Sequence, residues 1–296
     1  MKILMSGSSG LVGTSLMALL KGEGHDVRPL VRHGTEGVVW DAQTFQLQSP
    51  EQLETMDAVV HLAGESIVGR WSDAKKQRIL DSRVKSTAAL AGALAGLDKK
   101  PAVLVVASAV GYYGDRGAEE LTEDSAPGKG FLSEVCTAWE AAADAARQAG
   151  MRVVHLRFGM LLSPNGGALK AMLTPFKLGI GGKVGSGKQV VSWASLDDAV
   201  GAIHHALITE SLEGPVNVVS PAPCTNLELT KALGRALSRP TLFPVPAFAA
   251  RLAFGEMADA LLLASQRVIP KKLTESEYTF KHRDLEHTLQ ELLATP

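Results

Sequence analysis

Three glycines near the start of the chain have the spacing of a phosphate-binding turn. They stand in Gly7-Ser8-Ser9-Gly10-Leu11-Val12-Gly13, between a short apolar run and a helical pattern. In such a turn the first glycine permits a tight bend, the second lets a pyrophosphate approach the backbone, and the third lets the helix pack on the strand. The N-terminus of the helix then faces the negative charge of the ligand. The sequence therefore predicts a dinucleotide-binding turn made by Gly7, Ser9, Gly10, Leu11, Val12 and Gly13.

A basic residue follows the second apolar run, where a site for NAD would carry an acid. Arg32 comes directly after Val31, about twenty residues beyond Gly13, which is where an acid binds the ribose 2′-hydroxyl in NAD sites. Because the fork of a guanidinium matches phosphate geometry, Val31 and Arg32 favour a 2′-phosphate and therefore NADP(H). A solvated arginine at the end of a strand is the alternative interpretation.

Short apolar runs alternate with longer helical patterns through the first half of the chain. The runs that predict strands are 3–6, 27–31, 38–40, 58–62, 103–107 and 153–156, and the helical patterns are 11–21, 75–94 and 133–149. Strands joined by helices of this length form right-handed βαβ units, which predicts an α/β fold with a parallel sheet covered on both faces. The fourth run ends in the small residues Leu62, Ala63 and Gly64, which we expect against the adenosine side of the cofactor.

The composition changes after Pro164, which indicates a second unit. We expect a nucleotide-binding domain over residues 1–164, rejoined by residues 190–220, and a smaller substrate-side lobe over residues 165–189 and 221–296. A helix is predicted from residue 195 to 207, and the glycine-rich stretch 179–187 is expected to close over a ligand.

Charge and cysteine content exclude several classes of protein. Thirty basic and 31 acidic residues leave a formal net charge of −1, which gives no reason to expect nucleic acid or an anionic membrane as a partner. Two cysteines, Cys136 and Cys224, provide neither a disulfide framework nor a zinc site, and no metal is expected. Without a signal-peptide pattern or a membrane-spanning run, the chain is expected in the cytoplasm, with an organelle matrix as the alternative.

Taken together, these residues resemble the extended short-chain dehydrogenase/reductase family. The chain is most similar to an atypical branch of it, described as predicted nucleoside-diphosphate-sugar epimerases with a C-terminal domain of unknown function. The similar motifs span the chain and include residues 62–65, 82–83, 108–114, 139–140, 179–182, 192–193 and 267–270. The resemblance implies a doubly wound parallel Rossmann sheet with a smaller C-terminal substrate-side lobe.

The catalytic residues of that family are missing from the matching positions. The family uses a Tyr-x-x-x-Lys pair with a serine or threonine and an asparagine, the tyrosine acting as general acid or base. Here the tyrosine position falls on Leu132, the lysine position on Cys136 and the serine position on Ala109, with Ser108 beside it. Arg83 takes the place of the asparagine, so the usual mechanism is not expected to operate.

Three residues remain as candidates for chemistry, namely Arg83, Tyr112 and Tyr113. Arg83 is expected to face the cofactor or an anionic substrate, and either phenol is a candidate proton donor or a packing residue. One hypothesis is an NADP(H)-dependent oxidoreductase or epimerase-type enzyme acting on an unknown small molecule. The alternative is a non-catalytic NADP(H)-binding redox sensor or regulatory module. In sugar-nucleotide epimerases an arginine binds the diphosphate, and here its position falls on Val191. This valine weakens the hypothesis that the substrate is a sugar nucleotide.

Overall fold

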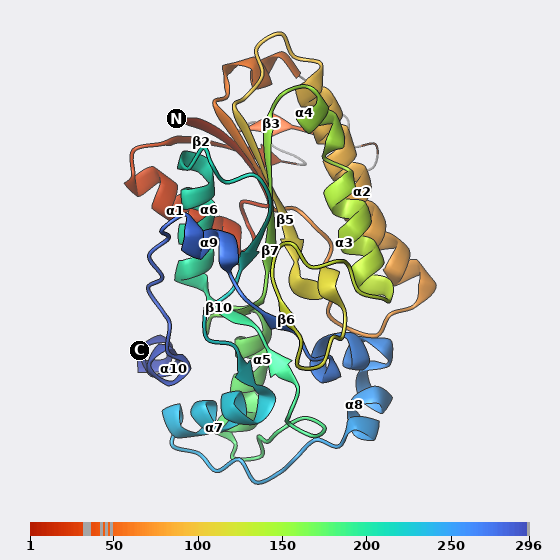
Figure 1. The fold of residues 1–296 in the computed structure, drawn as a ribbon, viewed down its shortest axis with the longest axis vertical. Coiled ribbons are helices and arrows are strands. Elements are labelled where there is room, and N and C mark those ends of the chain that lie inside the picture. The colour runs from red at the N-terminus through yellow and green to blue at the C-terminus, as the bar shows by residue number, and fades with distance from the viewer. Residues whose placement is uncertain (32–36, 42–43, 45–46, 48–49, 295–296) are drawn as a thin grey trace.

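The computed structural model of the protein describes residues 1–31, 37–41, 44, 47 and 50–294. Within these ranges, seven strands form one parallel sheet in the order β11-β7-β5-β4-β1-β2-β3 (Figure 1). The strands are β1 (Lys2–Ser6), β2 (Asp26–Val31), β3 (Val38–Val39), β4 (Ala58–His61), β5 (Val103–Ala109), β7 (Arg152–Phe158) and β11 (Gly214–Val218). The chain moves outward from β1 and then crosses back to β4 on its other side, which is the order of a doubly wound sheet. The predicted α/β fold class is confirmed.

Helices cover both faces of the sheet. Figure 1 shows α1 and α6 on one side and α2, α3 and α4 on the other. Their bounds are α1 (Leu11–Gly22), α2 (Asp73–Ala95), α3 (Phe131–Ala141), α4 (Asp144–Gln148) and α6 (Leu196–Ile208). The helix predicted over 133–149 is thus two helices, because Ala143 between them has φ −88° and ψ 0°, outside the helical range. The helix predicted from residue 195 is capped by Ser195, whose side chain accepts from Asp198 N.

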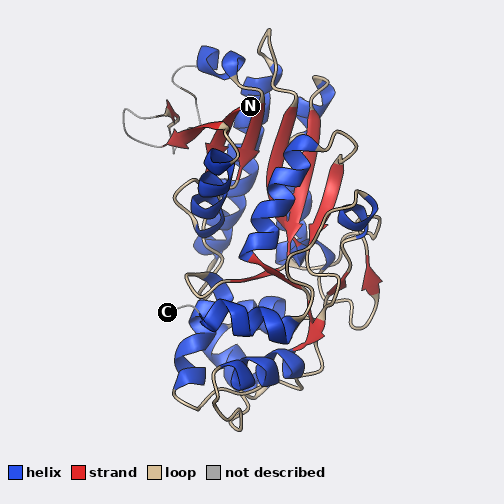
Figure 2. Cartoon of the chain, turned by 90° about the vertical axis from the view of Figure 1, so that its left-hand side faces the viewer, coloured by secondary structure: helices blue, strands red, loops and turns tan. Residues whose placement is uncertain are grey.

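The lobe lies beyond one end of the sheet (Figure 2). It has its own hydrophobic core. Its helices are α5 (Gly167–Lys177), α7 (Asn226–Ala236), α8 (Ala247–Phe254) and α10 (Leu285–Ala294). Trp193 is fully buried in this core, and its indole N–H donates to Ala222 O at 2.9 Å. The shorter elements are η1 (Pro50–Thr55), η2 (Val110–Tyr113), β6 (Glu120–Leu121), β8 (Met160–Leu162), β9 (Val190–Val191), β10 (Trp193–Ser195), β12 (Cys224–Thr225), η3 (Ala258–Leu263), β13 (Arg267–Val268) and α9 (Lys271–Glu275).

Close chain packing accounts for two glycines of the glycine-rich stretch. A Cβ on Gly182 would lie 2.0 Å from the carbonyl oxygen of Phe243, and one on Gly181 would lie 2.6 Å from the ring of Phe176. The expectation that this stretch closes over a ligand is therefore not needed to explain these glycines.

The C-terminal segment returns from the lobe to the sheet. Leu273 and Phe280, which sequence analysis places in the lobe, are buried in the core beneath α1 and α6. The buried carboxylate of Asp198 accepts hydrogen bonds from the backbone N–H groups of Lys281 at 2.7 Å and His282 at 3.0 Å. The N-terminal turn of α6 is therefore the anchor of this segment. Over the part of the chain that the structure describes, no helix has the length and apolar character needed to cross a membrane.

Candidate cofactor and active site

The glycine turn has the geometry that the sequence predicts for phosphate binding. Gly7 has φ +71°, and a Cβ on Gly13 would lie 2.1 Å from the carbonyl oxygen of Gly7. Only glycine fits at both positions, because the first needs left-handed backbone and the second lies directly against backbone. No side chain among the described residues caps the N-terminus of α1, and both Ser9 and Gly10 are exposed. The first N–H groups of α1 are thus open to an anion.

A buried chain of hydrogen bonds supports the wall behind this turn. The Oγ of Ser6 accepts the N–H groups of Leu62 and Ala63 at 3.1 and 3.2 Å and lies 2.7 Å from Nδ1 of His61. On the other side, Nε2 of His61 lies 3.1 Å from Oγ of Ser86, which donates to a backbone carbonyl. His61 therefore carries its proton on Nε2 and accepts from Ser6. Burial lowers the pKa of His61 to about 4, so the imidazole is neutral at pH 7.

Arg83 lies beside this wall, held in a fixed orientation. Its Nη1 donates to the carbonyl oxygens of Glu65 at 3.0 Å and Ile79 at 3.2 Å, and its Cζ lies 5.0 Å from the centroid of Trp139. A Cβ on Gly64 would come within 3.3 Å of the guanidinium carbon. Burial lowers the pKa of the Arg83 guanidinium, which still remains charged at neutral pH. Its Nε and Nη2 have no hydrogen-bond partner among the residues described.

Leu132 and Cys136, on which the sequence analysis places the family's tyrosine and lysine positions, pack against the turn η2. A Cβ on Gly111 would lie 3.2 Å from the Cβ of Leu132 and 3.9 Å from the Sγ of Cys136. Cys136 is 3% exposed, and burial raises the pKa of its thiol to about 12. Neither side chain exchanges a proton at neutral pH.

Tyr113 belongs to a buried polar network and does not face a ligand. It is fully buried, donates from its hydroxyl to Asn217 Oδ1 at 2.7 Å and accepts from Arg157 Nη1 at 2.9 Å. Arg157 also makes a bidentate ion pair with Glu140 at 2.8 Å, and Ser108 donates to the same carboxylate at 2.7 Å. Burial raises the pKa of the Tyr113 phenol to about 12. Of the two roles expected for Tyr113, proton donor or packing residue, its burial and partners favour packing.

Tyr112 differs from its neighbour in exposure and partners. Its side chain is half-buried, and its hydroxyl has no hydrogen-bond partner within the described part of the chain. The guanidinium carbon of Arg157 lies 3.5 Å from the ring centroid and holds the ring in place.

Sequence reasoning missed the residues that support the site. Ser6, Ser86, Arg157 and Glu140 form their hydrogen bonds with partners that are distant in sequence. A charged residue inside a buried strand, as Arg157 is in β7, does signal that a partner of opposite charge exists. Arg32, the residue predicted to select NADP(H), lies outside the described residues, although Val31 ends β2 as expected.

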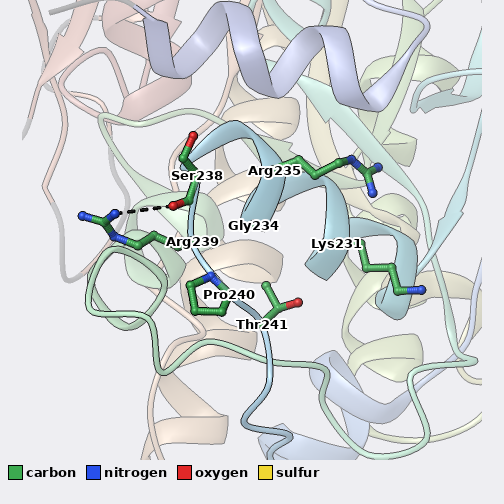
Figure 3. A pocket seen from close by; sticks show the side chains of 7 residues that line it. All are labelled: Lys231, Gly234, Arg235, Ser238, Arg239, Pro240 and Thr241. Carbon is green, nitrogen blue, oxygen red and sulfur yellow. Dashed lines mark hydrogen bonds between the residues drawn. The ribbon is translucent and has the colours of Figure 1, made fainter.

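A hollow of about 360 Å³ lies elsewhere, at the C-terminal end of α7 (Figure 3). It is lined by Lys231, Gly234, Arg235, Ser238, Arg239, Pro240 and Thr241. Arg235 pairs with Glu286 at 2.7 Å and Arg239 donates to Lys177 O at 2.9 Å, so two of its cations are already engaged. In the described ranges, no group of three or more His, Cys, Asp or Glu side chains is placed to hold a metal.

Family models match most of the chain. Residues 3–219 match the NAD dependent epimerase/dehydratase family, and residues 245–292 match a domain of unknown function, DUF1731. An epimerase family protein of Mycobacterium bovis is 43% identical over 291 residues, which cover 97% of this chain and 96% of the relative.

Two solved structures are similar in both sequence and fold. Human epimerase family protein SDR39U1 (isoform 2), crystallised with NADPH, has a TM-score of 0.90 and 33% identity over all of both chains. The nucleoside-diphosphate sugar epimerase from Corynebacterium glutamicum has a TM-score of 0.82 and 36% identity, covering 99% of this chain and 58% of that one.

Proposed function

This chain belongs to the NAD-dependent epimerase/dehydratase family, and we propose that it is an NADP(H)-dependent oxidoreductase or epimerase-type enzyme acting on a small molecule. The observation that carries the proposal is the open N-terminus of α1 beside the tight turn between Gly7 and Gly13. The NADPH in the human relative supports the choice of cofactor, as does the sequence position of Arg32 directly after Val31.

In the proposed complex, the pyrophosphate lies on the backbone from Ser9 to Gly13. The residues 62–64 form the wall beside it, and Ser6 Oγ fixes this wall by accepting the N–H groups of Leu62 and Ala63. Arg83 contributes a fixed positive charge next to Gly64, with two nitrogens free to bind cofactor oxygens or an anionic substrate. The bound nicotinamide supplies the hydride chemistry.

We assign the proton transfer to Tyr112. Proton exchange with a substrate needs an accessible group with a free hydroxyl, which describes Tyr112 but neither Tyr113 nor Cys136. Arg157 fixes the ring, and Glu140 in turn fixes Arg157 through two hydrogen bonds.

A substrate screen tests the enzymatic assignment. NADPH oxidation is followed with small carbonyl compounds and with sugar nucleotides, and the activity found is measured again in Arg83→Ala and Tyr112→Phe. Loss of general acid–base catalysis should lower kcat about 100-fold or more in Tyr112→Phe. Cys136→Ser is the matched control and should retain most of the activity. An activity that Cys136→Ser alone destroys would place the chemistry on α3 and refute the assignment.

Calorimetric titration tests the cofactor. Arg32→Glu removes the partner of the 2′-phosphate and adds a like charge, so NADPH affinity should fall about tenfold to a hundredfold, with little change for NADH. Equal affinity of the native protein for NADPH and NADH would contradict the proposed role of Arg32.

The apolar replacement of the catalytic pair favours a second candidate function, a redox-sensing module. Leu132 and Cys136 leave the usual proton relay without a titrating group near neutral pH. Tight NADPH binding without turnover in the screen, together with a change in shape or partner between NADP⁺ and NADPH, would favour this function over the enzyme.

A further inference from the structure

The C-terminal domain contacts the loop that leads into α2, beside the proposed site. The segment 69–76, between β4 and the first turn of α2, meets the junction of α8 and η3. Arg70 Nη1 donates to Leu252 O at 3.0 Å, and Gly69 N donates to Met257 Sδ at 3.2 Å. Lys76 forms an ion pair with Glu256. We call these three contacts the clasp.

The part of the lobe that carries the clasp is fixed at its two ends but weakly packed between them. At the first end, Val245 N donates to Lys183 O at 2.8 Å, and Val245 O accepts from Gly185 N at 2.8 Å. At the other, Gln189 Nε2 donates to Leu262 O at 2.9 Å. We call the intervening residues 246–261 the flap.

The flap buries Ala250, Met257 and Ala258 but little other hydrophobic surface. Of the eight residues of α8, Ala250 is buried, whereas Phe248 and Leu252 are 72% and 75% exposed. The helix ends at Gly255, with φ +60°, and continues into a π-helical turn, a conformation that is rare and frequent at functional sites. A segment with few buried contacts opens at low cost in free energy.

The other side of the clasp is continuous with the proposed cofactor wall. The carbonyl of Glu65 accepts from Arg83, and its carboxylate accepts from Lys75 Nζ at 2.7 Å, so the residues 64–76 form one connected loop. Trp71 in the middle of this loop packs edge-on against Phe131 of α3, with ring centroids 5.2 Å apart. The flap is therefore in direct contact with the loop that holds Arg83.

We propose that the flap gates the cofactor crevice and that the clasp keeps it closed. Within the clasp, the ion pair between Glu256 and Lys76 is the contact that holds the flap in the closed position. The inference rests on the proposed NADP(H) site and assigns a role to the first half of the C-terminal domain of unknown function. Opening of the clasp releases the loop 64–76 and lets the dinucleotide leave.

The dissociation rate of NADPH tests the gate. Bound NADPH is displaced by excess NADP⁺ in a stopped-flow instrument, and the fluorescence change gives the rate for the native protein, Glu256→Lys, Lys76→Glu and the double variant. Each single variant should release NADPH about two- to fivefold faster. A rate increase of this size corresponds to the free energy lost when a half-exposed ion pair is removed. The double variant restores opposite charges and should return to within about twofold of the native rate. Lys76 also lies over the ring of Phe131 at 5.1 Å, so Glu256→Lys is the cleaner single change.

A distant ion pair provides the control. Glu286→Lys removes the exposed pair with Arg235 in the lobe and should leave the NADPH dissociation rate unchanged. Melting temperatures of all variants should stay close to the native value, which separates gating from a loss of stability. An unchanged rate in Glu256→Lys, or a double variant that stays fast, would overturn the gate while leaving the proposed function intact. A native protein that binds no NADPH would overturn both.

Discussion

The imidazole of His61 should make the stability of this protein sensitive to acid. Burial lowers its pKa from 6.5 to about 4, and both of its ring nitrogens are hydrogen-bonded to serines. The unfolded chain takes up a proton near pH 6.5, whereas the folded chain does so only near pH 4. The stabilisation is therefore complete above pH 6.5 and is lost as the pH falls from 6.5 toward 4.

The size of the effect follows from the two pKa values. At pH 5 the unfolded chain carries the proton almost fully and the folded chain about a tenth of the time, so the free energy of unfolding falls by about 2 kcal/mol relative to pH 7. The loss reaches about 3 kcal/mol at pH 4. Because domains are commonly stable by about 5–15 kcal/mol, this loss is large enough to measure.

Urea unfolding at pH 7, 6 and 5 provides the assay, with His61→Gln as the test variant. Glutamine retains a donor and an acceptor but does not titrate, so the variant should lose less stability on acidification. At pH 7 it should be about 1–3 kcal/mol less stable, because an amide cannot reproduce both hydrogen bonds of the imidazole. The imidazoles of His25, His155 and His205 also have lowered pKa values. They contribute the same pH dependence of stability to the native protein and to His61→Gln, so they do not affect the comparison. His287→Gln is the control, since its side chain is 76% exposed. Parallel stability curves for the native protein and His61→Gln would refute the reasoning.

Three further substitutions test other parts of the structure. Gly13→Ala places a Cβ 2.1 Å from the Gly7 carbonyl oxygen and should cost about 1–3 kcal/mol in urea unfolding, and a native-like midpoint would contradict that contact. Gly10→Val, with only the Gly7 oxygen within 4 Å of its Cβ, should keep the native melting temperature but abolish NADPH binding by calorimetry. Asp198→Ala leaves the N–H groups of Lys281 and His282 without an acceptor, so we expect a loss of about 3–5 kcal/mol and early proteolysis near residue 280. Unchanged resistance to protease would exclude Asp198 as the anchor.

Features that depend on local sequence were predictable, and features that depend on distant pairing were not. The glycine turn and the strand β5 follow from spacing and from an unbroken apolar run, and both lie as predicted. By contrast, the hydrogen bonds of Ser6 and Ser86 to His61 join three elements, and no spacing relates these residues. Composition alone also could not separate the two phenols of η2, since Tyr113 is buried by partners on β7 and β11 while Tyr112 is not.

The return of the C-terminal segment to the sheet has a consequence for how the chain folds during synthesis. The face beneath α1 and α6 contains Leu16 and Ile203 but is completed only by Leu273 and Phe280. A nascent chain that has emerged as far as residue 220 has all seven strands of the sheet yet leaves this apolar surface uncovered. Contacts that span most of the sequence slow folding, and exposed apolar surface favours aggregation in the meantime. We therefore expect this face to be completed only once residue 280 has left the ribosome, and versions that end before residue 280 to depend on chaperones.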